Sequence, residues 1–250
     1  MKNFIGFLLL LTFANVSAQS IPGYMGKRLT IGYSGDYMIA FAETSRGNDG
    51  IGMKHAHALN FEYTIRNRTN FCFQLRYFKT GISSIGSYYY GNSAVTYQSR
   101  DGRPLQLNSF NIGLGYKFFN KGLLAPVGKY IKPEILFLIN KCSYERDRFL
   151  YYDGGQKYAN IGTGEYTTFD LGLTYQIGRQ RVIGDRIVID SGLRLGVMAS
   201  AFFSNVGSIL FDSSGYSSST FASRLDNAIM NRTFGHEFFN VHLGIGFLAF

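Results

Sequence analysis

The feature that most constrains this chain is an alternation of apolar and polar residues that recurs along its length. It is clearest at 235–250, where the odd positions from Phe239 to Phe247 are apolar and the even positions from Asn240 to Gly246 are small or polar. A period of two residues is the pattern of a β-strand with one apolar face. The sequence therefore predicts that the chain closes on a strand, and this strand ends at the aromatic Phe250.

Seven earlier segments show the same alternation, which predicts an all-β protein of eight strands. The predicted strands are 27–41, 53–66, 70–81, 105–119, 129–141, 164–178, 186–200 and 235–250. The connections after the first, third, fifth and seventh strands are long, and those after the second, fourth and sixth are short. This alternation is typical of an antiparallel transmembrane β-barrel with long loops at one end and short turns at the other.

Two of the long connections leave alternatives open. The connection 142–163 contains Asp153-Gly154-Gly155, which predicts a hairpin extension over 148–158. The connection 201–234 is read as the longest loop, although an additional hairpin there would give a barrel of ten strands.

The N-terminus has the pattern of a secretory signal peptide over residues 1–18. Lys2 precedes an apolar run from Phe4 to Phe13, and the small-residue cleavage site Val16-Ser17-Ala18 follows. The predicted mature barrel is 19–250. No later apolar run approaches the 20 or so residues that a membrane-spanning helix needs.

The export signal, the alternating segments and the terminal aromatic residue together resemble small bacterial outer-membrane β-barrels of the OmpA-like and OmpW-like families, in a single-domain form. The resemblance implies an integral outer-membrane protein with both termini in the periplasm, in contact with membrane lipid and lipopolysaccharide. It also implies a monomer whose last strand is recognised by the barrel-assembly machinery, with Phe250 as the C-terminal assembly signal. Phe250 is out of phase with Phe247, and a bulge near Leu248 would restore the phase.

The polar face of the predicted strands carries charges of both signs, which we expect to form an ionic network inside the barrel. An eight-stranded barrel is just wide enough to be filled by its own side chains, and buried charges persist when they are paired. The alternative is a soluble barrel with these charges outside. The predicted network is Arg28, Asp36, Glu62, Arg66, Arg76, Lys117, Lys132, Glu134, Asp170, Asp190 and Arg194.

The net charge of +9 does not indicate nucleic acid as a partner. Basic residues are scattered singly, with no run of three, and an exported protein does not meet cytoplasmic nucleic acid. A positive surface facing anionic lipid headgroups is the better interpretation.

The residues that could carry chemistry do not form a recognisable site. His236 and Glu237 are neighbours, which places them on opposite faces of a strand, so they are not expected to act as a dyad. His55 and His57 share a face but lack a third metal ligand. Cys72 and Cys142 lie near opposite ends of the barrel, too far apart for a disulfide.

No enzyme activity, metal or cofactor is therefore expected. The sequence favours a structural or surface-interaction role through the long loops. A narrow pore or conduit for small apolar molecules is the second hypothesis, and a lipid-modifying enzyme is the third.

Overall fold

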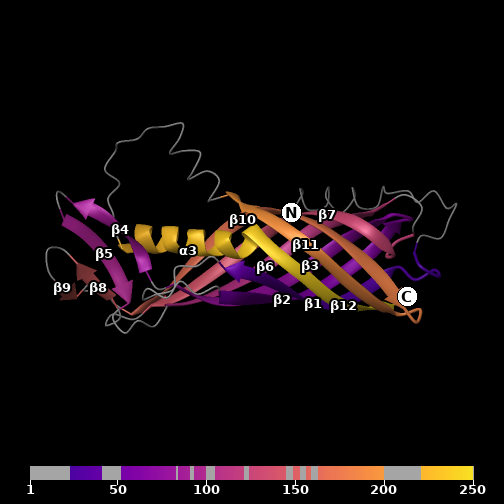
Figure 1. Cartoon of the computed structure of the whole chain (residues 1–250), viewed down its shortest axis with the longest axis horizontal. Coiled ribbons are helices and arrows are strands. Elements are labelled where there is room, and N and C mark those ends of the chain that lie inside the picture. Colours follow the sequence, from indigo (N-terminus) through magenta and orange to yellow (C-terminus); the bar gives the residue numbers. More distant parts are fainter. Residues whose placement is uncertain are drawn as a thin grey trace, which may run out of the picture.

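The computed structural model is a closed barrel of eight antiparallel strands, as the sequence predicted (Figure 1). It describes residues 23–40, 52–82, 84–90, 93–99, 105–120, 124–144, 149–152, 156–158, 163–199 and 221–249. The predicted signal peptide, residues 1–18, and Phe250 lie outside these ranges. The barrel strands are β1 (Leu29–Ala40), β2 (Gly52–Arg66), β3 (Thr69–Ile82), β6 (Leu105–Phe119), β7 (Gly128–Tyr144), β10 (Gly164–Ile183), β11 (Ile187–Met198) and β12 (Phe239–Ala249). Each strand pairs with its neighbours in this order, and β12 pairs with β1 to close the ring.

Beyond one end of the barrel, two of the long connections form a second, small sheet. It comprises β4 (Ser84–Tyr90), β5 (Ser93–Ser99), β8 (Phe149–Tyr152) and β9 (Gln156–Tyr158), in the order β4-β5-β8-β9. The predicted hairpin over 148–158 corresponds to β8 and β9. The long connection after the third predicted strand is also not a simple loop, because β4 and β5 form a hairpin there and join β8 from the next connection.

The connection before the last strand contains a helix, α3 (Phe221–Phe238), which the sequence analysis did not predict. Its buried residues Leu225, Ile229, Thr233 and His236 recur every three or four positions, the period of a helix with one buried side. The interpretation of 201–234 as a loop and of 235–238 as strand was therefore wrong over the described part. The alternation of β12 begins only at Phe239, directly after the helix. No extra hairpin enters the wall in the described residues, and the ring closes with eight strands.

The outer face of the barrel is apolar, and the inner face is polar except for the apolar side chains beneath α3 at the loop end. Outward side chains such as Phe169 and Leu173 are 75% and 65% exposed, whereas the inward Arg76 and Arg194 are 1% and 0% exposed. On β12 the apolar outward column runs from Phe239 to Phe247, which spans roughly 20 Å along the barrel axis after allowance for strand tilt. This is close to the apolar band of about 25 Å on outer-membrane barrels. A soluble barrel would have the opposite arrangement of faces.

No helix in the described residues is long and apolar enough to cross a membrane.

Candidate functional site: the charged interior of the barrel

The structure brings eight of the eleven predicted network residues together inside the barrel, all of them buried. They are Asp36, Glu62, Arg76, Lys117, Lys132, Glu134, Asp190 and Arg194. The other three do not join them. Arg28 precedes β1 and is half-buried, Arg66 ends β2 and is exposed, and Asp170 is half-buried on β10, where it accepts a hydrogen bond from the backbone of Leu171. The period-two pattern alone does not distinguish residues at the ends of strands from residues inside the barrel.

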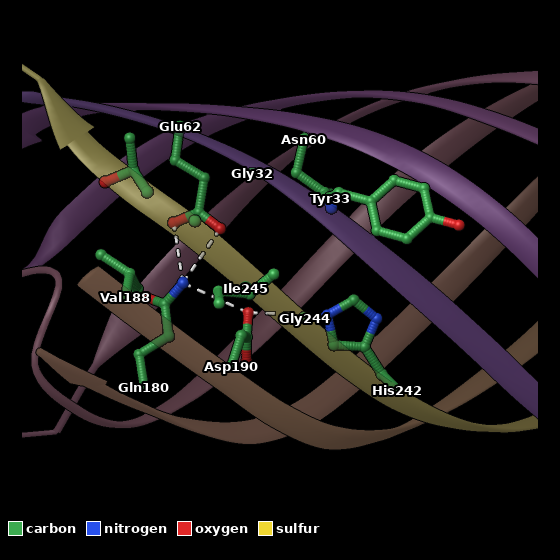
Figure 2. A pocket seen from close by; sticks show the side chains of 12 residues that line it. Gly32, Tyr33, Asn60, Glu62, Gln180, Val188, Asp190, His242, Gly244 and Ile245 are labelled. Atoms are coloured by element: carbon green, nitrogen blue, oxygen red, sulfur yellow. Dashed lines mark hydrogen bonds and ion pairs between the residues drawn. The ribbon is translucent and has the colours of Figure 1, made fainter. Parts of the chain in front are cut away.

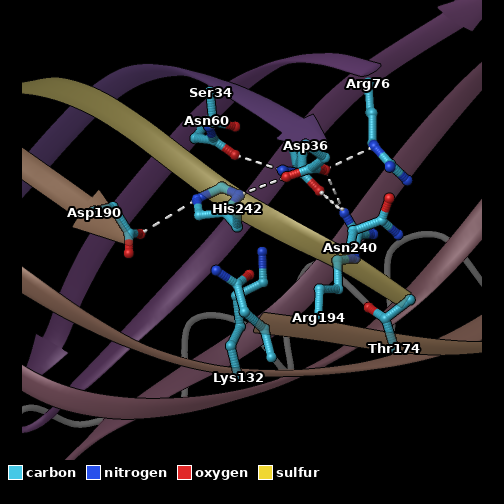
Figure 3. Close-up of polar contacts among 12 residues, drawn as sticks. Ser34, Asp36, Asn60, Arg76, Lys132, Thr174, Asp190, Arg194, Asn240 and His242 are labelled. Atoms are coloured by element: carbon cyan, nitrogen blue, oxygen red, sulfur yellow. Dashed lines mark hydrogen bonds and ion pairs between the residues drawn. The ribbon is translucent and has the colours of Figure 1, made fainter. Parts of the chain in front are cut away.

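Asp36, on β1, is the centre of the network (Figure 3). One carboxylate oxygen lies 2.8 Å from Nε of Arg76 and 3.2 Å from Nη1 of Arg194. The other lies 2.6 Å from Nδ1 of His242. Asp36 thus links β1 to its neighbour β12, where His242 is its register partner, and to β3 and β11 through the interior.

A second cluster lies toward the short turns and is centred on Lys117. Its ammonium group lies 2.5 Å from Glu62 and 2.9 Å from Asp190, and it sits 4.2 Å from the ring centre of Tyr130. The Tyr130 hydroxyl donates to Asp190 at 2.6 Å, and Gln180 donates to both carboxylates. The lysine is therefore held by two acids and one aromatic face.

A fourth acid, Glu134, lies between Lys132 and Arg194. Its oxygens are 3.0 Å from the Lys132 ammonium and 3.2 Å from Nη2 of Arg194, and Thr174 donates to it at 3.1 Å. Arg194 therefore contacts Asp36 and Glu134 at once, and it is the cation that links most of the network.

Two network residues were missed by the sequence analysis. Glu237, at the end of α3, accepts hydrogen bonds from Arg76 and from Asn111, the latter at 2.9 Å, and lies 3.8 Å from Arg194. His242 lies between Asp36 and Asp190, with Nε2 3.6 Å from the latter. The position of His242 on the polar face of the last strand could have identified it as a network residue. Glu237 could not be found without predicting the helix.

The network is close to electrically balanced. Its acids are Asp36, Glu62, Glu134, Asp190 and Glu237, and its fixed cations are Arg76, Lys117, Lys132 and Arg194. A proton on His242 would complete the balance. Because a buried charge is costly unless it is paired, near-neutrality is what allows this many ionised groups to share one interior.

Little space is left between these side chains. A cavity of about 20 Å³, close to the volume needed for one water molecule, lies between Glu62, Gln180, Asp190 and His242 (Figure 2). Glycines make close packing possible at some inward positions. A Cβ on Gly178 would come within 2.4 Å of the Tyr130 hydroxyl and 2.6 Å of the Ser191 carbonyl oxygen.

Helix α3 covers the interior at the end with the long loops. Leu225 and Ile229 pack with Ile82, Leu105, Leu107 and Cys142 on the inner faces of β3, β6 and β7. Nearer the helix end, Phe234 packs against Leu136, Leu138 and Met198. The helix is therefore attached by apolar contacts along its length and by the charge of Glu237 at its end.

We expect Glu237→Gln to loosen α3 while leaving the barrel closed. The substitution removes the charge that Arg76 and Arg194 face, and hydrogen bonds to charged groups contribute about 1.5–3 kcal/mol. Hydrogen exchange at the backbone amides of 225–236 should become at least about tenfold faster. Asn231→Ala, at an exposed position of the same helix, is the control. If the amides of 225–236 exchanged at the same rate in both variants, a role of Glu237 in anchoring the helix would be contradicted.

The other candidate residues do not form a catalytic or metal centre in the described residues. His236 stacks on Phe78 with ring centres 4.2 Å apart, and burial lowers its pKa to about 2, so its ring is a very weak base. His55 and His57 are exposed with ring centres 4.9 Å apart, and His57 bonds Tyr33. No group of three metal-binding side chains occurs in the described part of the chain.

Cys72 and Cys142 are both free, as predicted, and both are buried. Cys72 lies near the turn end of β3, and Cys142 lies in the apolar cluster beneath α3.

No protein-family model and no curated protein matches the sequence. Solved structures with a similar arrangement include Ail, the attachment invasion locus protein of Yersinia pestis, which is 10% identical over 88% of this chain and 96% of that chain, with a TM-score of 0.37. Neisserial surface protein A is 10% identical over 88% and 97%, with a TM-score of 0.39. The N-terminal β-barrel domain of Pseudomonas aeruginosa OprF is 7% identical over 88% and 97%, with a TM-score of 0.36.

Likenesses at this level carry no conclusion about activity. The closed ring of strands and its apolar outer face decide the class. The chain is a small transmembrane β-barrel.

Proposed function

We propose that this protein is an integral outer-membrane barrel with a closed interior, and that it serves a structural or surface-interaction role through the elements at its loop end. The observation that carries the proposal is the filling of the interior by paired charges, with α3 packed over them. A barrel whose interior is filled by side chains has little room to conduct solutes. Its outer surface and its loops are then the parts that can interact with other molecules.

The small sheet is the best candidate for the interacting surface. It extends past the barrel strands at the same end as α3 (Figure 1). Its strands include Tyr88–Tyr90, Tyr97, Tyr151, Tyr152 and Tyr158 in the sequence. Tyrosine is enriched in recognition surfaces, because it combines a large apolar area with a hydrogen-bonding hydroxyl at a low cost in conformational entropy.

In the proposed orientation the short turns and both termini face the periplasm, and the small sheet and α3 face outward. The partners are membrane lipid, lipopolysaccharide and the barrel-assembly machinery, the last acting on β12 with Phe250. The protein is a monomer and does not bind nucleic acid. Neither a catalytic residue nor a cofactor is assigned.

The proposal can be tested by removing the β4–β5 hairpin. Ile82 and Leu105 are register partners, so a two-residue Asn-Gly turn can join them. The shortened chain should still form a barrel that resists SDS until boiled, and both proteins should show no steady conductance in planar bilayers. Binding of the protein, displayed on a host bacterium, to matrix or cell surfaces should be lost only in the shortened chain.

Two outcomes would contradict the proposal. Steady channels from the intact protein, with a porin as positive control, would favour the narrow pore. Unchanged surface binding after removal of the hairpin would show that the small sheet is not the interacting element.

A further inference from the structure

Three cations lie together on the outward face of the barrel, near the short turns. Lys129 on β7 and Arg179 and Arg181 on β10 are all exposed. Lys129 and Arg179 are direct partners in the register of the two strands. Like charges placed directly opposite each other destabilise an antiparallel pair, so this arrangement favours an anion between them.

The chain itself supplies little to offset these charges. Among the described residues, the outward faces of β7 and β10 hold one ion pair, Lys141 with Glu165 at 2.7 Å, and it lies at the opposite, loop end. The residue on the other side of Arg179 is Ser191 of β11, which is also exposed. The three cations and the Ser191 hydroxyl therefore lie close together on the outer face of the barrel.

An apolar groove begins next to this position, toward the loop end, and extends from β3 across β6, β7 and β10 to β11. It has a volume of about 780 Å³, and its lining includes Pro133 and Ile135 of β7, Leu173 and Tyr175 of β10, and Leu195 of β11. The register runs from Tyr175–Pro133 through Ile177–Ile131 to Arg179–Lys129. The part of the groove on β7 and β10 and the cations thus lie on one outward column, with Tyr175 and Arg179 about 13 Å apart along the strand.

We propose that this column binds one anionic glycerophospholipid from the leaflet at the turn end, with its phosphate on Lys129, Arg179 and Arg181 and an acyl chain in the groove. The two features follow each other in the same order as the headgroup and the acyl chain of a lipid. The cations lie at the edge of the apolar band, where a phosphate would be, and the groove lies within the band, where an acyl chain would be. Arginine and lysine are suited to phosphate, which accepts several charge-assisted hydrogen bonds at once. This site rests on the proposed function, which names membrane lipid only in general, and it specifies the class of lipid and where that lipid binds.

The test is retention of lipid by the purified, folded full chain, measured by native mass spectrometry in detergent. The probes are phosphatidylglycerol and zwitterionic phosphatidylcholine of equal chain length. The wild type should prefer phosphatidylglycerol, and the triple variant K129Q/R179Q/R181Q should bind it at least about tenfold more weakly, since each basic residue contributes to anionic-lipid attraction. Both proteins must resist SDS before boiling, which shows that they are folded.

The matched control removes three other cations from the same end of the barrel. K27Q/R66Q/R68Q loses the same charge from the segment before β1, from the end of β2 and from the β2–β3 turn, and it should retain phosphatidylglycerol like the wild type. An equal loss of affinity for phosphatidylglycerol in both triple variants would mean that net charge alone explains the effect, and this would overturn the site. An unchanged affinity in K129Q/R179Q/R181Q would also overturn it. Displacement of the phospholipid by lipopolysaccharide at equal concentration would overturn the choice of ligand.

Discussion

Arg194→Met should lower the free energy of unfolding by about 3–5 kcal/mol, the largest effect expected for a single substitution in this protein. The side chain is fully buried and contacts Asp36 at 3.2 Å and Glu134 at 3.2 Å, with Glu237 at 3.8 Å. Methionine keeps much of the volume but none of the charge. The three carboxylates would then lose a shared cation, and an uncompensated buried charge is strongly destabilising.

The measurement is equilibrium unfolding by denaturant, with the protein folded into lipid vesicles. Arg66→Met is the control, because Arg66 is exposed at the end of β2 and should cost less than about 1 kcal/mol. Similar small losses for both variants would mean that Arg194 does not hold the network together. The restored stability of a double variant that also removes Glu134 would identify the unpaired acid as the cause.

Leu173→Arg should destabilise the folded barrel by about 2–4 kcal/mol in a bilayer. Leu173 is 65% exposed and lies midway along the outward apolar column of β10, between Phe169 and Ile177. An arginine there would have to place its charge near the middle of the hydrocarbon region. The same change at Ile183, at the turn end of β10, should cost only about 0–1 kcal/mol, because it lies at the interface.

This pair of variants also separates the two interpretations of the alternating strands. In a soluble barrel, arginine at an exposed leucine would cost little at either position, and both variants would remain folded without detergent. A depth-dependent loss of stability, measured by unfolding from vesicles of defined thickness, is expected only when the outer face is in lipid.

The wall of the barrel was predictable from the sequence because it depends on local patterning. Outward residues such as Ile245 and inward residues such as Glu62 differ in parity along their strands, and parity survives any error in strand boundaries. The same reasoning placed Arg66 and Asp170 in the interior, since parity gives a face but not a depth.

The pairing of charges inside the barrel was not predictable in the same way. Asp36 meets Arg76, Arg194 and His242 because the stagger of the strands brings three distant positions to one level. Helix α3 was missed because Phe238 and Phe239 continue into an alternating strand, and the pattern was extended backward past its true start at Phe239. Glu237, the partner of Arg76 at the end of that helix, was therefore not recognised as part of the network.

The direct join between α3 and β12 also connects the outside of the molecule with its interior. The helix lies beside β4 of the small sheet near one end and places Glu237 against Arg76 at the other, with no loop between Phe238 and Phe239 to absorb movement (Figure 1). A partner that binds more tightly when the helix is docked must strengthen the Glu237 contacts by the same free energy, and the reverse holds equally. Binding of a partner at the loop end and formation of the Glu237 contacts in the interior are therefore thermodynamically coupled.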